Sequence, residues 1–143
     1  MSLINILQPN QYNIFAGSFN SSNPINITTN GYVIRHWTAQ TVGATPVICF
    51  SYAASNNKAY SVETMCQGLS TVNDISSLKR GGSFSFFGGV LSYRGFFYDQ
   101  WYSSPGLPTT ALNYSVTGSN INVYLVGVAG KTVNWSGVTY IYF

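Results

Sequence analysis

The stretch Ile27-Thr28-Thr29-Asn30-Gly31-Tyr32-Val33-Ile34 decides the fold class of this chain. β-branched and aromatic residues, which favour strands, stand on both sides of Asn30-Gly31. An Asn-Gly pair readily adopts the positive φ angles that a type I′ turn requires. The stretch therefore predicts two antiparallel strands joined by a tight hairpin turn.

The same pattern recurs along the whole chain. Runs rich in Val, Ile, Thr, Tyr, Phe and Trp, spaced about ten residues apart, are separated by clusters of Gly, Asn, Pro and Ser. A single helical turn is predicted in 72–79, capped by Asn73 or Asp74 and ended by Gly81-Gly82. Gly81-Gly82 and Gly88-Gly89 also predict bulges or a bend where two backbones approach closely. The predicted strands cover 12–19, 25–29, 32–39, 46–53, 59–67, 83–93, 96–102, 112–117, 121–128 and 132–143.

Short strands linked by hairpins predict an all-β protein, an antiparallel β-sandwich of jelly-roll type. Two further hairpin turns are expected, at 55–58 and at 118–120. The turn at 55–58 would place Cys49 and Cys66 on one face of a sheet. A cross-strand disulfide and two buried thiols both stay open, and the thiols are the favoured interpretation.

The composition places the chain among charge-poor globular proteins. Its 143 residues suffice for one domain with a buried core. Only 6% are charged, against ~25% in average proteins, and 16% are aromatic, which excludes disorder. The net charge of +3 comes from scattered basic residues, so no nucleic-acid surface is expected. Residues 1–24 are interpreted as an arm or connector, and residues 25–143 as the compact β-sandwich domain that follows it.

The chain offers few features of membrane or metal-binding proteins. No run of about 18 apolar residues occurs, and the first residues lack the basic and apolar regions of a secretory signal. We therefore expect no membrane span. Cys49, Cys66 and the single His36 supply too few soft ligands for a zinc site, so no metal and no cofactor is expected.

The residues that enzymes need are also scarce. Glu63, Asp74 and Asp99 are the only carboxylates, and a glycosidase would need two of them about 5 to 9.5 Å apart across a sugar. His36 lies inside a strand-like run without a G-x-S-x-G motif, which favours a structural histidine. Dinucleotide and P-loop motifs are missing. The sequence therefore predicts a protein that is not an enzyme.

Two aromatic-rich runs, 83–93 and 96–102, carry few of the charges that normally protect an exposed sheet edge. A monomer would expose much of this apolar surface, so we expect an obligate homo-oligomer. The alternative is a single core that hides all of these rings.

The same region concentrates residue types that recognise ligands. Aromatic faces stack on sugars, and the polar groups fix orientation. Strict alternation would place Phe96, Tyr98 and Gln100 on one face and Phe97, Asp99 and Trp101 on the other, so that half of the rings belong to a core or subunit seam. The candidate contacts with a receptor or glycan are Tyr93, Arg94, Tyr98, Asp99, Gln100, Trp101 and Tyr102.

The segment from Val116 to Trp135 resembles the distal domains of tailed-phage fibre and tail proteins. A hydrophobic strand, a turn at Gly118-Ser119-Asn120 and an alternating strand precede Gly127-Val128-Ala129-Gly130-Lys131-Thr132, and Trp135 then returns to the core. Residues 59–63 and 79–82 resemble these domains more loosely, whereas 96–102 has no counterpart in the pattern.

This resemblance implies a virion structural protein, a homotrimeric fibre or spike head exposed on the virion surface and extracellular when functional. Its implied partners are a fibre shaft, capsid or tail component and, for host attachment, a host surface receptor or glycan. A soluble, lectin-like carbohydrate-binding module is the alternative. A pore-forming protein fits less well, because a long amphipathic helix with a basic face is missing.

Overall fold

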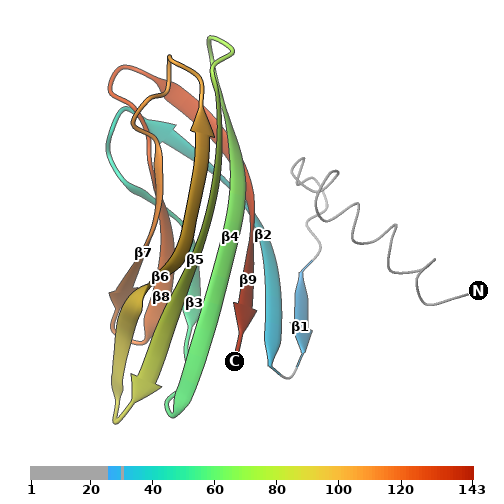
Figure 1. The fold of residues 1–143 in the computed structure, drawn as a ribbon, viewed down its shortest axis with the longest axis vertical. Coiled ribbons are helices and arrows are strands. Elements are labelled where there is room, and N and C mark those ends of the chain that lie inside the picture. The colour runs from blue at the N-terminus through green and yellow to red at the C-terminus, as the bar shows by residue number, and fades with distance from the viewer. Residues whose placement is uncertain (1–25, 30) are drawn as a thin grey trace, which may run out of the picture.

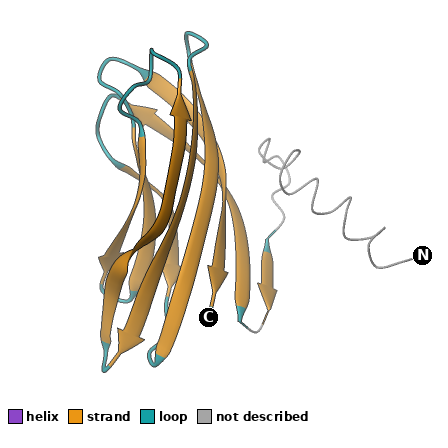
Figure 2. Ribbon diagram, in the orientation of Figure 1, coloured by secondary structure: helices purple, strands orange, loops and turns teal. Residues whose placement is uncertain are grey.

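The computed structural model describes residues 26–29 and 31–143, which form strands joined by short loops (Figures 1 and 2). All strand pairings are antiparallel. The predicted all-β antiparallel sandwich is confirmed, whereas the predicted strand 12–19 and the arm 1–24 lie outside the described residues. The strands are β1 (Ile27–Thr29), β2 (Tyr32–Val42), β3 (Val47–Ala53), β4 (Lys58–Ser70), β5 (Ile75–Phe87), β6 (Val90–Ser103), β7 (Ala111–Thr117), β8 (Asn120–Val126) and β9 (Thr132–Tyr142).

Two sheets of unequal size pack face to face (Figure 1). The large sheet has the strand order β1-β2-β9-β4-β5-β6, and the small sheet has the order β3-β8-β7. We call the face of the large sheet that packs on the small sheet its inner face, and the opposite one its outer face. Within the described residues, no second sheet covers the outer face.

The core between the sheets holds two tryptophans whose polar atoms are satisfied. Trp37 and Trp135 are only 7% and 1% exposed. The indole N–H of Trp37 donates to Oγ1 of Thr139, and that of Trp135 donates to Oγ1 of Thr41, both at 3.0 Å. Because each indole N–H has a partner, burial leaves neither tryptophan with an unsatisfied donor. The predicted return of Trp135 to the core is confirmed.

Strand β9 connects the two parts of the large sheet, because it pairs with β2 on one side and β4 on the other. Gly137 of β9 pairs with Trp37, and a Cβ atom at Gly137 would overlap the Trp37 ring. Gly68 of β4 pairs with Trp135, and a Cβ atom there would lie 2.7 Å from that ring. The two glycines therefore leave the space that the tryptophan rings occupy.

Two predicted hairpin turns are confirmed by the strand register. Thr29 pairs with Tyr32, and Gly31 between them has a φ angle of 86°, while Asn30 lies outside the described residues. Thr117 pairs with Asn120, so that two residues form the second turn. These turns join β1 to β2 and β7 to β8.

The predicted strand 83–93 is wrong, because the chain reverses in its middle. Gly88 and Gly89 have φ angles of 61° and 79°, and Phe87 pairs with Val90 across them. Two successive positive φ angles suit glycine and make a hairpin turn between β5 and β6. This pair is thus a turn and not a bulge.

The predicted helical turn in 72–79 is also wrong. A tight turn follows β4, and β5 begins at Ile75. Asn73 has a φ of 64°, which interrupts a right-handed helix. The hydroxyl of Ser70 accepts two backbone N–H bonds of this turn, at 3.2 and 3.0 Å, and so replaces the bonds that a helix would have formed.

The predicted hairpin at 55–58 is wrong as well, because the strands it joins, β3 and β4, belong to different sheets. Cys49 and Cys66 therefore approach the core from opposite sheets, and both thiols are free. Burial raises the pKa of Cys49 to about 12 and the pKa of Cys66 well above its usual value. Both side chains thus stay protonated, unreactive thiols, as the favoured interpretation expected.

Strand β6 is a free edge of the large sheet, and two bulges interrupt its pairing with β5. At one of them Gly81 pairs with Tyr98 and Gly82 with Phe96, which leaves Phe97 as the extra residue. This confirms the bulge predicted at Gly81-Gly82 and corrects the alternation predicted for 96–101. Phe97 and Tyr98 share the outer face, with ring centroids 5.1 Å apart, whereas Phe96 lies on the inner side.

Candidate functional site

A row of polar and aromatic side chains crosses the outer face of the large sheet. Gln67 of β4 pairs with Ser136 of β9 on one side and with Ser77 of β5 on the other. Ser77 pairs in turn with Tyr102 of β6. Directly paired residues of antiparallel strands point to the same face. These side chains, far apart in the sequence, therefore form a continuous row across β9, β4, β5 and β6.

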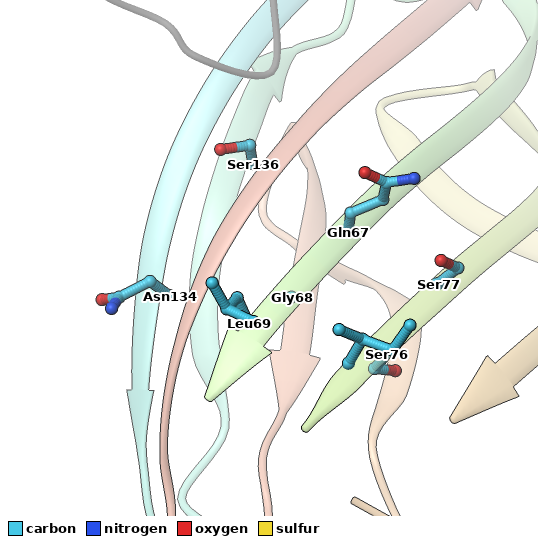
Figure 3. Close-up of a pocket in the computed structure, with 8 residues that line it drawn as sticks. Gln67, Gly68, Leu69, Ser76, Ser77, Asn134 and Ser136 are labelled. Atoms are coloured by element: carbon cyan, nitrogen blue, oxygen red, sulfur yellow. The ribbon is translucent and has the colours of Figure 1, made fainter. Parts of the chain in front are cut away.

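Two hollows open along this row, and Figure 3 shows the one that includes Asn134 and Ser136. One, of about 470 Å³, is lined by β9, β4 and β5, and the other, of about 440 Å³, is lined by β4, β5 and β6. Both are lined by Gln67 and Ser77, so together they form a single depression that we call the outer groove. Its other polar and aromatic lining residues are Asn134, Ser136, Lys79, Gln100, Trp101 and Tyr102, together with the buried Ser76.

The outer groove combines hydrogen-bonding groups with flat apolar surfaces. The amides of Gln67 and Gln100 each donate and accept hydrogen bonds, and the serine hydroxyls do both as well. Tyr102, which pairs with Ser77 on the outer face, is 59% exposed, so its ring is open to a ligand. This combination suits a ligand with many hydroxyl groups and apolar C–H faces.

Beside the outer groove, Glu63 stands among tyrosines. It pairs with Tyr140 on β9 and with Gly81 on β5, and the ring of Tyr98 lies over the bare backbone of Gly81. Burial, and next the Glu63 carboxylate, raise the pKa of Tyr98 and also that of Tyr142. The phenols of Tyr98 and Tyr142 therefore stay protonated near neutral pH.

Strand β6 divides the sequence-predicted candidate residues between its two faces. Tyr98, Gln100 and Tyr102 lie on the outer face, and the last two line the outer groove. Trp101 pairs with the core residue Leu78, so its side chain points toward the opposite face of β6, and at the strand edge it borders both the outer groove and a smaller hollow. The structure therefore brings Gln100, Trp101 and Tyr102 together, with Tyr98 beside them.

The remaining candidates lie away from the outer groove. Tyr93 faces the core, with its ring centroid 5.0 Å from that of Phe84. The Nε atom of Arg94 donates to Oγ of Ser85 at 2.7 Å. Asp99 forms an ion pair with Arg80, with a distance of 3.5 Å between Oδ2 and Nη1.

Sequence reasoning missed the groove residues outside β6, namely Gln67, Ser77, Lys79, Asn134 and Ser136. Each of them follows the two-residue alternation of its strand, and that alternation could have marked it as outward-facing. No local pattern indicates that β9 lies beside β4, so the sequence could not place Ser136 next to Gln67.

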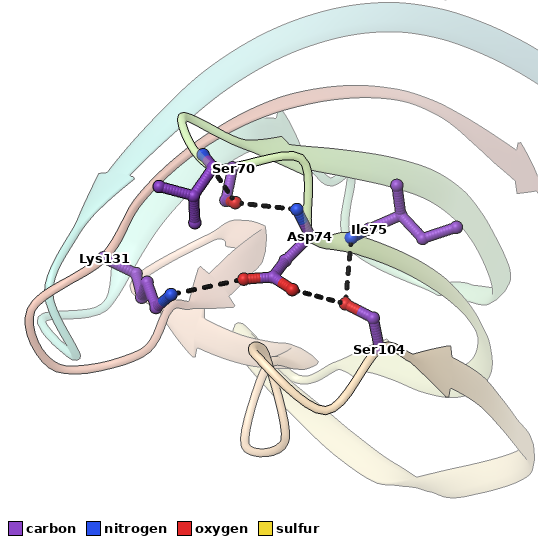
Figure 4. A network of polar contacts seen from close by, with 6 residues as sticks. Ser70, Asp74, Ile75, Ser104 and Lys131 are labelled. Carbon is purple, nitrogen blue, oxygen red and sulfur yellow. Dashed lines mark hydrogen bonds and ion pairs between the residues drawn. The ribbon is translucent and has the colours of Figure 1, made fainter.

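A polar network joins three loops at the end of the sandwich where the outer groove lies (Figure 4). The carboxylate of Asp74, in the β4–β5 turn, accepts hydrogen bonds from Nζ of Lys131 and from Oγ of Ser104, both at 3.2 Å. Oγ of Ser104 accepts in turn from the N–H of Ile75 at 3.1 Å. The Asp74 carboxylate thus fixes the turn that precedes β5. The first residue of β5, Ile75, lines the outer groove.

His36 lies on the outer face of β2, opposite Val138, and is 7% exposed. Neither ring nitrogen has a hydrogen-bond partner among the described residues. Burial lowers the pKa of His36, because water no longer stabilises its charged form. His36 is therefore a neutral, buried side chain, as expected of a structural histidine.

The other ionisable groups are dispersed over the described part of the chain. Glu63 lies on the outer face of β4, Asp74 in the β4–β5 turn, and Asp99 beside Arg80 on the other side of β6. In residues 26–29 and 31–143, no group of three or more His, Cys, Asp or Glu side chains could hold a metal ion. The same residues include no helix long and apolar enough to cross a membrane.

Comparison with known proteins yields a faint structural likeness. No protein-family model matches the chain, and no curated protein matches it. Among solved structures, the chain is similar to the tailspike protein gp49 of Acinetobacter baumannii bacteriophage Fri1, a capsular polysaccharide depolymerase, with a TM-score of 0.38 and 6% identity. The match covers 88% of this chain and 21% of that one, so this chain spans about a fifth of the tailspike's length. The similarity is too low to assign an activity.

The Asp74 network leads to a stability prediction. Asp74→Ala should lower the free energy of unfolding by about 1–2 kcal/mol, because it removes two hydrogen bonds to a charged group. Asp74→Asn, which keeps an acceptor for Ser104, should cost less than about 1 kcal/mol, since the ion pair with Lys131 is partly exposed. Urea unfolding measures both. Asp99→Ala is the matched control and should have little effect, because the Asp99 side chain is 41% exposed; an equal loss for Asp74→Ala and Asp99→Ala would contradict the role of the network.

Burial of His36 leads to a prediction about pH. The folded pKa lies below the usual value of 6.5, so the unfolded chain takes up a proton first as the pH falls. The stabilising contribution of neutral, buried His36 should therefore be fully present above pH 6.5. It should be lost as the pH falls below 6.5. Thermal unfolding between pH 7.5 and 5 should show a smaller pH slope for His36→Gln than for the wild type. Identical slopes would show that His36 does not contribute.

Proposed function

We propose that this chain is the β-structured head of a virion fibre or spike, and that it attaches to a host surface by binding a glycan in the outer groove. The observation that carries the proposal is the row of hydroxyl, amide and aromatic side chains across β9, β4, β5 and β6. A sugar presents the complementary groups: hydroxyls for Gln67, Ser77 and Gln100, and a C–H face for Tyr102.

Binding without catalysis suits the groove better than a hydrolytic reaction. No carboxylate lines either hollow within the described part of the chain. Hydrolysis of a glycoside requires a pair of them in most enzyme families. The proposal therefore assigns the groove to recognition, and the strands that carry it form a rigid support for the ligand.

The proposal also includes a homotrimer on the virion, with residues 1–24 as the connector to a shaft. Exposed apolar side chains support an assembly. Phe87 and Val90, which pair at the tip of the β5–β6 hairpin, are 76% and 63% exposed, and Phe96 and Phe97 are 60% and 50% exposed. Neighbouring copies of the chain would remove these side chains from water.

A soluble carbohydrate-binding module is the second candidate, because it would use the same groove. The two functions differ in assembly: the module would work as a monomer, whereas the fibre head would not. The oligomeric state in solution therefore separates them.

The first test is glycan binding. A glycan array should show a selective response. Gln67→Ala and Gln100→Ala should each lower the affinity for the best ligand about five- to tenfold, because each variant loses hydrogen bonds to the sugar. Quenching of Trp101 fluorescence measures the affinity in solution. Asn120→Ala, which removes an exposed amide at the β7–β8 turn, is the control and should bind normally. A flat array, or equal losses in all three variants, would refute the assignment of the groove.

The second test is the state of assembly. Sedimentation of the wild-type protein should give a trimer, and the double variant Phe87→Ser, Val90→Ser should shift it toward monomer with an unchanged β circular-dichroism spectrum. Val42→Ser alters another exposed apolar residue, 64% exposed on β2, and should leave the trimer intact. A wild-type monomer at micromolar concentration would eliminate the fibre head and leave the carbohydrate-binding module.

A further inference from the structure

Lys79 is the one charged side chain among the residues that line the outer groove within residues 26–29 and 31–143. It lies on β5 between Met65 of β4 and Gln100 of β6, on the same outer face. Its side chain is half-buried. The groove thus carries a single positive charge among its described lining residues.

The structure leaves this charge without a carboxylate partner. Arg80, the next residue, pairs with Asp99, and Lys131 pairs with Asp74. Among the described residues, Lys79 has no such ion pair; its Nζ atom lies 5.1 Å from the ring centroid of Tyr98. A cation–π contact compensates less than an anion would, and an ammonium group has three donors to offer.

We propose that the ligand of the outer groove is an acidic oligosaccharide, whose carboxylate binds Lys79. This inference rests on the proposed glycan-binding function and adds the chemical class of the sugar. The amides of Gln67 and Gln100 flank Lys79 and donate further hydrogen bonds to the same carboxylate. Hydrogen bonds between charged groups are shorter and stronger than those between neutral ones, so the acidic group dominates the selection.

The residues on either side of Lys79 along the sheet determine where the carboxylate of the ligand binds. Glu63 pairs with Gly81, two residues along β5 from Lys79, so the backbone of Glu63 lies about 7 Å along the strands from the level of Lys79. Ser77 lies two residues away in the opposite direction and pairs with Gln67. Repulsion by Glu63 excludes an anion from its own side. The acidic group therefore lies between Lys79 and the Gln67–Ser77 pair.

The length of the groove requires more than one sugar ring. It extends from β9 to β6, which is three interstrand spacings, or about 14 Å. With the acidic sugar at Lys79, a neighbouring ring lies over Tyr102 at the β6 end. The next sugar in the other direction meets Asn134 and Ser136 at the β9 end.

The test uses the full-length protein and an array that presents uronic-acid and sialic-acid oligosaccharides beside their carboxyl-reduced counterparts. The strongest ligands should carry carboxylates. Reduction of their carboxyl groups should lower the affinity about tenfold or more, which matches the loss of a hydrogen bond to a charged group. Lys79→Met should lower the affinity for the acidic oligosaccharide by the same factor and leave the affinity for the carboxyl-reduced oligosaccharide unchanged. Lys79→Arg should keep most of the affinity because it keeps the charge.

Lys58→Met is the matched control, because Lys58 lies over the Phe143 ring and lines neither hollow. It should bind both forms as the wild type does. Equal affinity of the wild type for acidic and reduced oligosaccharides would overturn the acidic class and leave the glycan function standing. Failure to bind any sugar on the array would instead overturn the glycan function and this inference with it.

Discussion

The position of β9 is the constraint on which the rest of the structure depends. This C-terminal strand pairs with β2 and β4 at once, and without it the large sheet would separate into two pieces. The close packing of tryptophan rings beside Gly68 and Gly137 makes this insertion specific, because any larger residue would collide with a ring. The outer groove begins on β9, so the candidate site exists only when this last strand is in place.

The two faces of the large sheet satisfy polar groups in different ways. On the inner face, buried threonines such as Thr41 and Thr139 accept the indole hydrogen bonds, and the core needs no charge. On the outer face, Gln67, Ser77 and Gln100 line an open groove. With only 6% of its residues charged, the chain relies on hydroxyl and amide groups at its surface. A lone ammonium such as that of Lys79 therefore has an unusually strong influence on what binds nearby.

Strand β6 shows how an edge can be protected without charges. Its sequence predicts an unguarded strand that would recruit other chains through its backbone. The structure instead contains two bulges, which interrupt the regular row of N–H and C=O groups that another strand would need. The apolar side chains on this edge remain exposed, so an assembly would form through side-chain contacts around Phe87 and Phe97 and not through continuation of the sheet.

By itself the sequence determined the all-β class, the turn at Asn30-Gly31, the two-residue turn that Gly118 begins and the bulge at Gly81-Gly82, because each depends on residues that are neighbours along the chain. It pointed to Gln100, Trp101 and Tyr102 for the same reason: they stand together in one run. The tertiary structure alone decided that β3 and β4 lie in different sheets, that Phe97 and Tyr98 share a face, and that Ser136 meets Gln67. Those arrangements follow from burial and pairing between distant strands, and a local pattern carries no information about which distant strand will be the neighbour.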